Sequence, residues 1–106
     1  MPKYLISASY TAEGAKGLLK DGGTKRKATV QSFVEKMGGK VDAFHFAFGM
    51  NDVYIIVDMP DAASVSALSL NVAATGAVRL ATTVLLSPQE VDAAVAKTVE
   101  YRAPGD

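Results

Sequence analysis

Residues 41–58 constrain the fold more than any other stretch, because apolar side chains recur at every second position on both sides of the break Gly49-Met50-Asn51-Asp52. A period of two is typical of β-strands, and Gly, Asn and Asp are typical of the turn that joins two strands. The stretch therefore predicts a β-hairpin. With residues 49–52 as its loop, the predicted pairs are Phe48 with Val53, Ala47 with Tyr54, Phe46 with Ile55, His45 with Ile56 and Phe44 with Val57.

Paired residues share a face of the sheet, so this register divides the hairpin into two faces. The first is wholly apolar and is expected to be core; it carries Phe44, Phe46, Phe48, Val53, Ile55 and Val57. The second carries His45, Ala47, Tyr54 and Ile56. This second face holds the only histidine of the chain, and we expect it to carry the function.

The rest of the chain supplies two more strands and several helices. We expect strands at 3–10 and 78–86, and helices at 11–20, 24–37, 61–75 and 88–101. The expected N-caps are Thr11, Thr24, Asp61 and Ser87. The run from Ser87 to Glu90 combines a capping box with proline at the first helical position. We expect residues 1–101 to form one domain and residues 102–106 to form a tail.

The order strand, helix, strand, strand, helix, strand is that of the ferredoxin-like split βαβ arrangement. The fold class predicted is therefore α+β: a βαββαβ sandwich with a four-stranded antiparallel sheet and an extra C-terminal helix. Helices cover one face of such a sheet, and the other must meet water, a ligand or a second subunit. Two sheets packed face to face would give a dimeric α+β barrel, so we expect a homodimer or a higher homo-oligomer.

Composition excludes several classes of function. Eleven basic and eleven acidic residues cancel, so neither nucleic acid nor a membrane surface is an expected partner. Cysteine is absent, which excludes disulfides and thiolate metal sites. No apolar stretch approaches the roughly 20 residues that span a bilayer, and no signal-peptide core is present. We expect a soluble cytoplasmic protein that holds neither a metal nor a cofactor.

Several phrases of the chain resemble the GYD domain family. They are Met1-Pro2-Lys3-Tyr4-Leu5-Ile6, Ala8-Ser9-Tyr10-Thr11, Gly38-Gly39-Lys40, Phe46-Ala47-Phe48-Gly49, Asp52-Val53-Tyr54 and Gly76-Ala77-Val78-Arg79-Leu80. The resemblance runs from the N-terminus to about Glu90. It implies a small bacterial protein of the dimeric α+β barrel kind, and it implies no settled activity.

The chain departs from the family pattern at two places. The family is named for a Gly-Tyr-Asp signature at the hairpin turn, where this chain has Gly49, Asn51 and Asp52, with Asn51 in the place of the tyrosine. His45 stands where the similar phrase Phe-Tyr-Phe-Ala-Phe has tyrosine. The turn residues Asn51 and Asp52 are expected to serve the backbone, by tolerating unusual angles and bonding to local amides, and the alternative is contact with a ligand.

Candidate site residues follow from the second face of the sheet. The expected ligand-binding residues are Ser7, Ser9, His45, Tyr54, Arg79 and Thr83. His45 is the candidate general acid or base, and the alternative is a histidine that only packs in the sheet. Arg79 is suited to a carboxylate or phosphate, and the alternative is an ion pair within the protein.

Three functions remain open at this point. The preferred one is an oligomeric protein that binds a small organic or anionic ligand on the open sheet face. The second is a cofactor-free enzyme of the dimeric barrel type, monooxygenase-like or lyase-like, that uses His45. The third is an interaction module without a ligand.

Overall fold

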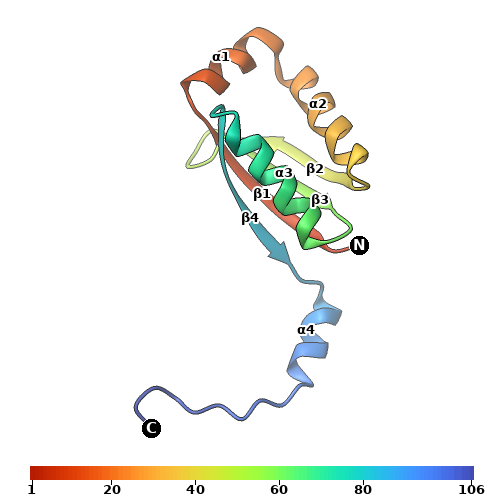
Figure 1. Cartoon of the computed structure of the whole chain (residues 1–106), viewed down its shortest axis with the longest axis vertical. Helices are drawn as coiled ribbons and strands as arrows, with labels where there is room; N and C mark the ends of the chain where they lie inside the picture. Colours follow the sequence, from red (N-terminus) through yellow and green to blue (C-terminus); the bar gives the residue numbers. More distant parts are fainter.

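A computed structural model describes residues 1–106 and contains one four-stranded antiparallel sheet (Figure 1). The strands are β1 (Lys3–Tyr10), β2 (Lys40–Phe46), β3 (Val53–Asp58) and β4 (Val78–Leu85). The helices are α1 (Ala12–Asp21), α2 (Gly23–Lys36), α3 (Ala62–Ala74) and α4 (Pro88–Val95). The strand order across the sheet is β2-β3-β1-β4. This order confirms the predicted α+β, ferredoxin-like arrangement.

Local signals in the sequence set most helix ends. The Thr11 hydroxyl accepts a hydrogen bond from the Gly14 amide and caps α1, and Asp61 accepts one from the Ser64 amide at 2.7 Å and caps α3. Ser87 forms the predicted capping box of α4. The expected cap at Thr24 is wrong. Gly22, with φ of 80°, turns the chain directly from α1 into α2, so residue 24 already lies in the first turn of that helix.

The core lies between the sheet and the helices α2 and α3. Its buried residues are Tyr4, Ile6, Ala8, Val30, Val34, Val53, Ile55, Val57, Met59, Val65, Leu68 and Val78. In β1 the buried side chains alternate with less buried ones, as the period of two requires. The β1 side chains at even positions therefore face the helices, and those at odd positions face the other way.

The hairpin register differs from the prediction by two residues. Phe46 lies opposite Val53, and His45 lies opposite Tyr54. The Ala47 amide donates to the Asp52 carbonyl at 2.8 Å, which closes a loop at 48–51 rather than 49–52. A shift by two keeps every side chain on its predicted face.

Phe48 is the exception, because it lies in the loop and not in a strand. Its side chain is fully exposed, so its predicted place in the core is wrong. Phe46 keeps its predicted face and lies beside Gly23 of α2, but it is 37% exposed on the edge strand and does not belong to the core as predicted. A second irregularity follows in β2, where Val41 pairs with Val57 and Ala43 with Ile56. Asp42 is therefore the extra residue of a β-bulge.

Helix α4 extends away from the sheet, as Figure 1 shows, and residues 88–102 are all exposed. The helix ends at Val95, earlier than the expected end near Tyr101. None of the helices has the length and apolar character that crossing a membrane would require.

Candidate functional site

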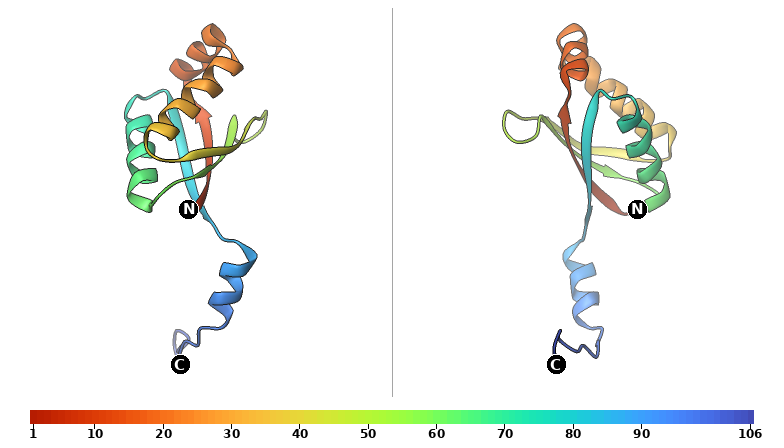
Figure 2. Two further views of the ribbon diagram at one scale, coloured as in Figure 1. Left: turned by 90° about the vertical axis from the view of Figure 1, so that its right-hand side faces the viewer. Right: turned by 60° about the vertical axis from the view of Figure 1, so that its left-hand side comes forward.

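The face of the sheet opposite the helices is called the open face here. It consists of the outward side chains Leu5, Ser7, Ser9, Ala43, His45, Tyr54, Ile56, Arg79, Ala81, Thr83 and Leu85. In Figure 2 the helices α2 and α3 lie on one side of the sheet, and the hairpin loop projects on the opposite side. No side chain of the open face belongs to the buried core.

Strand register arranges the open face in rows that run across the sheet. One row is His45, Tyr54, Ser7 and Ala81, and the next is Ala43, Ile56, Leu5 and Thr83. On the other side of the first row, Ser9 lies opposite Arg79. The six predicted ligand-binding residues therefore share one face, on strands about 4.8 Å apart.

Ser9, Asn51 and Tyr54 form a hydrogen-bonded chain at one end of this face. The Ser9 hydroxyl lies 3.3 Å from the Asn51 side-chain oxygen and 3.3 Å from the Met50 carbonyl. The Asn51 side-chain amide donates to the Tyr54 phenol oxygen at 3.3 Å. Because that oxygen accepts from Asn51, the phenol proton of Tyr54 is free to be donated to a ligand.

Asn51 was predicted as a turn residue that serves the backbone, and its hydrogen bonds to side chains of the strands were not predicted. The sequence placed it in the turn as a backbone residue, whereas the structure places its side chain between β1 and β3. Asn51 can reach both strands because of where the hairpin loop begins and ends. With the loop at 48–51, Asn51 precedes the paired residue Asp52 and lies beside the end of β1.

His45 is exposed and lies directly opposite Tyr54 in the sheet. The Tyr54 oxygen takes its hydrogen bond from Asn51 and not from His45. The structure therefore brings the imidazole to the site without an internal partner that fixes its orientation.

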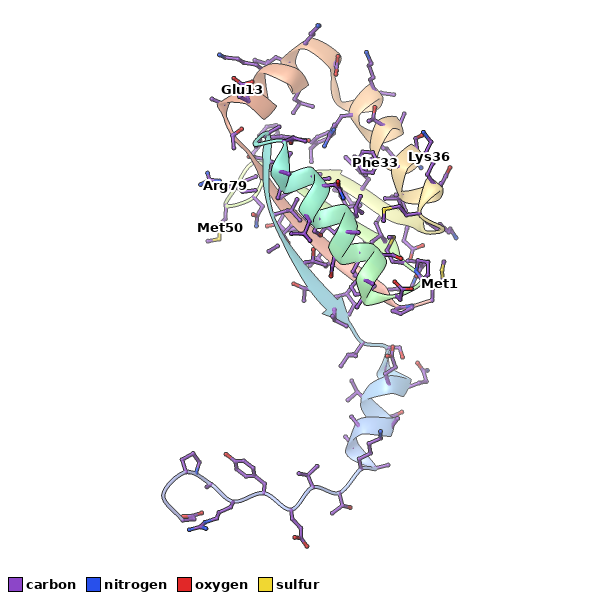
Figure 3. The ribbon with its side chains drawn as sticks, viewed as in Figure 1. Met1, Glu13, Phe33, Lys36, Met50 and Arg79 are labelled. Atoms are coloured by element: carbon purple, nitrogen blue, oxygen red, sulfur yellow. The ribbon has the colours of Figure 1, made fainter.

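Arg79 is exposed at the same end of the face, and Figure 3 labels it near Met50 of the hairpin loop. The ion pairs between side chains are Lys3 with Asp42, Lys3 with Asp58 and Lys25 with Asp21. All are made by lysines, so the Arg79 guanidinium has no carboxylate partner in the chain. The alternative of an ion pair within one chain is therefore not what the structure contains.

At the opposite end of the open face, the charged side chains form ion pairs with one another. Lys3 contacts both Asp42 and Asp58, and these hydrogen bonds, to Asp42 above all, raise the pKa of Lys3. The same contact with Lys3 lowers the pKa of Asp42. The open face thus has a paired cation at one end and an unpaired cation, Arg79, at the other.

The structure brings together no cluster of three or more His, Asp or Glu side chains that would hold a metal ion. What the open face offers chemically is a set of polar side chains and one cation, interspersed with apolar side chains of the sheet. Such a set suits the recognition of an anionic or carbonyl-bearing organic molecule.

Comparison with known proteins identifies the family. The model of the GYD domain matches residues 4–95, which is most of the chain. No curated protein and no solved structure matches the chain. The match covers every strand of the sheet and both sides of the candidate site. The chain therefore belongs to the GYD domain family.

Proposed function

We propose that this protein is a homo-oligomer that binds a small organic anion on the open face, between two copies of the sheet. One observation carries the proposal. The unpaired cation Arg79 lies opposite Ser9, and the Ser9 hydroxyl is hydrogen-bonded to Asn51. All three residues lie at the face of the sheet that no helix covers. An exposed and unpaired guanidinium is a suitable partner for a carboxylate or phosphate.

A second copy is part of the proposal because the open face is the surface of a sheet. Ligand sites in proteins are concave and bury most of the ligand surface. The partner's sheet would provide the opposite wall, at the spacing of about 10 Å that separates packed sheets. The apolar members of the face, Leu5, Ile56 and Leu85, supply the contact area that such packing needs.

The residues of the open face have distinct roles in this proposal. Arg79 pairs with the acidic group of the ligand, and its forked guanidinium favours a planar carboxylate or a phosphate. Tyr54 donates its phenol proton, since its oxygen already accepts from Asn51. His45 provides a further polar contact in the neighbouring row, and Ser7 and Thr83 line the floor.

Ligand binding is better supported than catalysis. A catalytic histidine is usually held by a hydrogen bond that fixes its ring, and the Tyr54 oxygen next to His45 is bonded to Asn51 instead. We therefore assign His45 to ligand contact. An interaction module without a ligand is the remaining alternative, and the experiment below separates it from the proposal.

The test is a thermal-shift screen of small carboxylates and phosphates, followed by calorimetric titration of any compound that stabilises the protein. We expect a ligand to raise the Tm of the wild type and of the control Arg102→Ala, whose change lies in the exposed C-terminal segment. The same ligand should stabilise Arg79→Ala and His45→Ala much less. An oligomer that responds to no anion would favour the interaction module, and equal responses of Arg79→Ala and the wild type would refute the site.

A further inference from the structure

A sizeable cavity lies on the helix side of the sheet, opposite to the open face. It is a groove of about 540 Å³ between α1 and α2 on one side and α3 on the other. Its apolar lining includes Tyr10, Phe33, Met37, Leu68, Val72 and Val78. Figure 3 labels Glu13, Phe33 and Lys36, which lie along this groove.

The groove exists because α2 and α3 cover different edges of the sheet. Helix α2 packs on β2, and α3 packs on β4. These strands are the two edges of the order β2-β3-β1-β4, so the gap between the helices lies over the central strands. A smaller apolar cavity of about 40 Å³ continues beneath the groove and is lined by core residues such as Ile6 and Val53.

Arg26 lies where the groove meets this inner cavity. It lines both of them, and it is partly buried. The other charged lining residues, Glu13, Asp21 and Lys36, line only the outer groove. Since lysines make all ion pairs between side chains, and Asp21 is taken by Lys25 at 3.4 Å, Arg26 has no carboxylate partner.

Arg26 is partly buried and has no carboxylate partner, and an anionic group placed against its guanidinium would supply one. The walls next to Arg26 are apolar and aromatic, since Tyr10 and Phe33 line both cavities as well. The groove volume lies within the range of about 300–1,000 Å³ that is usual for small-molecule sites. The acidic lining residues Glu13 and Asp21 belong to the outer groove alone, so the inner end at Arg26 is the part that suits an anionic group.

We propose that this groove is a second binding site, for a carboxylic acid with an apolar body. The carboxylate pairs with Arg26, and the apolar chain lies along Phe33, Leu68 and Val72. This site is separate from the open face, because the sheet lies between them. The proposal therefore does not depend on the function proposed above.

Two substitutions in the groove lining and one matched control test this site. Gly17 lines the groove, and a Cβ built on it meets no atom within 4 Å, so Gly17→Leu places a side chain there without a clash at its Cβ. Arg26→Gln removes the charge. Lys27→Ala removes the neighbouring cation, which is exposed and does not line the groove.

The experiment is an NMR titration of the ¹⁵N-labelled full chain with octanoate, with octanol as the uncharged probe. We expect octanoate to shift the amide signals of residues 26–37 and 68–78. Arg26→Gln should weaken its binding by about tenfold or more, because a hydrogen bond to a charged group is lost. Gly17→Leu should weaken it as well, and Lys27→Ala should bind like the wild type.

Several outcomes would overturn the proposal. They are octanoate shifts confined to the open face around Tyr54 and Arg79, octanol binding as tightly as octanoate, and unchanged affinity in Arg26→Gln. Intermolecular contacts from residues 88–103 of another copy to Phe33 would assign the groove to a subunit interface instead. The wild-type shift map decides between these sites even if a variant fails to fold.

Discussion

The carboxylate of Asp52 accepts a hydrogen bond from the backbone amide of Tyr10 at 2.8 Å. The backbone amide of Asp52 donates to the Ala8 carbonyl, also at 2.8 Å. The aspartate of the hairpin turn therefore fastens the loop to the end of β1, the strand from which Thr11 starts α1. Through this attachment the same residue positions Asn51 on the open face and Tyr10 at the groove.

Asp52→Ala should lower the free energy of unfolding by about 1.5–3 kcal/mol, the usual range for hydrogen bonds to a charged group. Asp52→Asn should lower the free energy of unfolding by less, because its side-chain oxygen still accepts a hydrogen bond from the Tyr10 amide. Urea denaturation followed by circular dichroism measures both. Equal stability of Asp52→Ala and the wild type would mean that the loop is not held in this way.

Two glycines of α1 should respond to alanine in opposite directions. A Cβ at Gly14 would lie 2.0 Å from the Ala77 carbonyl oxygen, whereas a Cβ at Gly17 meets nothing within 4 Å. Gly17→Ala should therefore stabilise the protein by up to about 1 kcal/mol, the helix-propensity difference. Gly14→Ala should destabilise it, since the backbone of α1 must move away from residue 77.

Thermal unfolding of the two glycine variants provides the comparison, with each as the control for the other. A stabilised Gly14→Ala would contradict the close approach of α1 to the start of β4. Loss of stability in Gly17→Ala would contradict the open space beside that residue.

The cap of α3 should make stability depend on acid pH. The Ser64 amide donates to the carboxylate of Asp61, and this hydrogen bond lowers the pKa of Asp61 below its usual value of 3.8. A lowered folded pKa means that the stabilisation is fully present above the unfolded pKa. It is lost as the pH falls through the folded pKa.

Asp61→Asn keeps the capping oxygen but cannot titrate, so its stability should fall less steeply than that of the wild type below about pH 4. Chemical denaturation at a series of pH values measures the slope. Parallel curves for Asp61→Asn and the wild type would show that the carboxylate does not contribute in this range.

The corrected hairpin register predicts a large difference between two phenylalanines. Phe44 packs against the core, and Phe48 is fully exposed in the loop. Phe44→Ala should cost about 2 kcal/mol, less than truncation of a fully buried phenylalanine, because Phe44 is partly buried. Phe48→Ala should change the free energy of unfolding by less than about 0.5 kcal/mol. Comparable losses in the two variants would restore the register in which both face the core.

The faces of the sheet could be predicted from the sequence, but the register could not. Side-chain alternation depends only on the period of two, so His45 and Tyr54 share a face in either register. The register depends on the bulge at Asp42 and on the bonds of Asp52 to β1, which join residues far apart in the chain. No local pattern encodes such bonds.

The helix caps at Thr11, Asp61 and Ser87 were predictable because their partners lie three residues away. The groove at Arg26 was not predictable from the sequence, because it arises from the separation of α2 and α3 over the sheet. Read in isolation, Arg26 belongs to a basic run, Lys25-Arg26-Lys27, in which no residue stands out. Only the packing of the helices distinguishes the three side chains.

The particle mass in solution shows whether a second copy covers the open face, as proposed. Light scattering on the eluting protein should give at least twice the chain mass of 11.1 kDa for the wild type. Ile56→Glu, which places a charge in the middle of the open face, should shift the mass toward a single chain. A wild-type mass of one chain at every concentration tested would contradict the account.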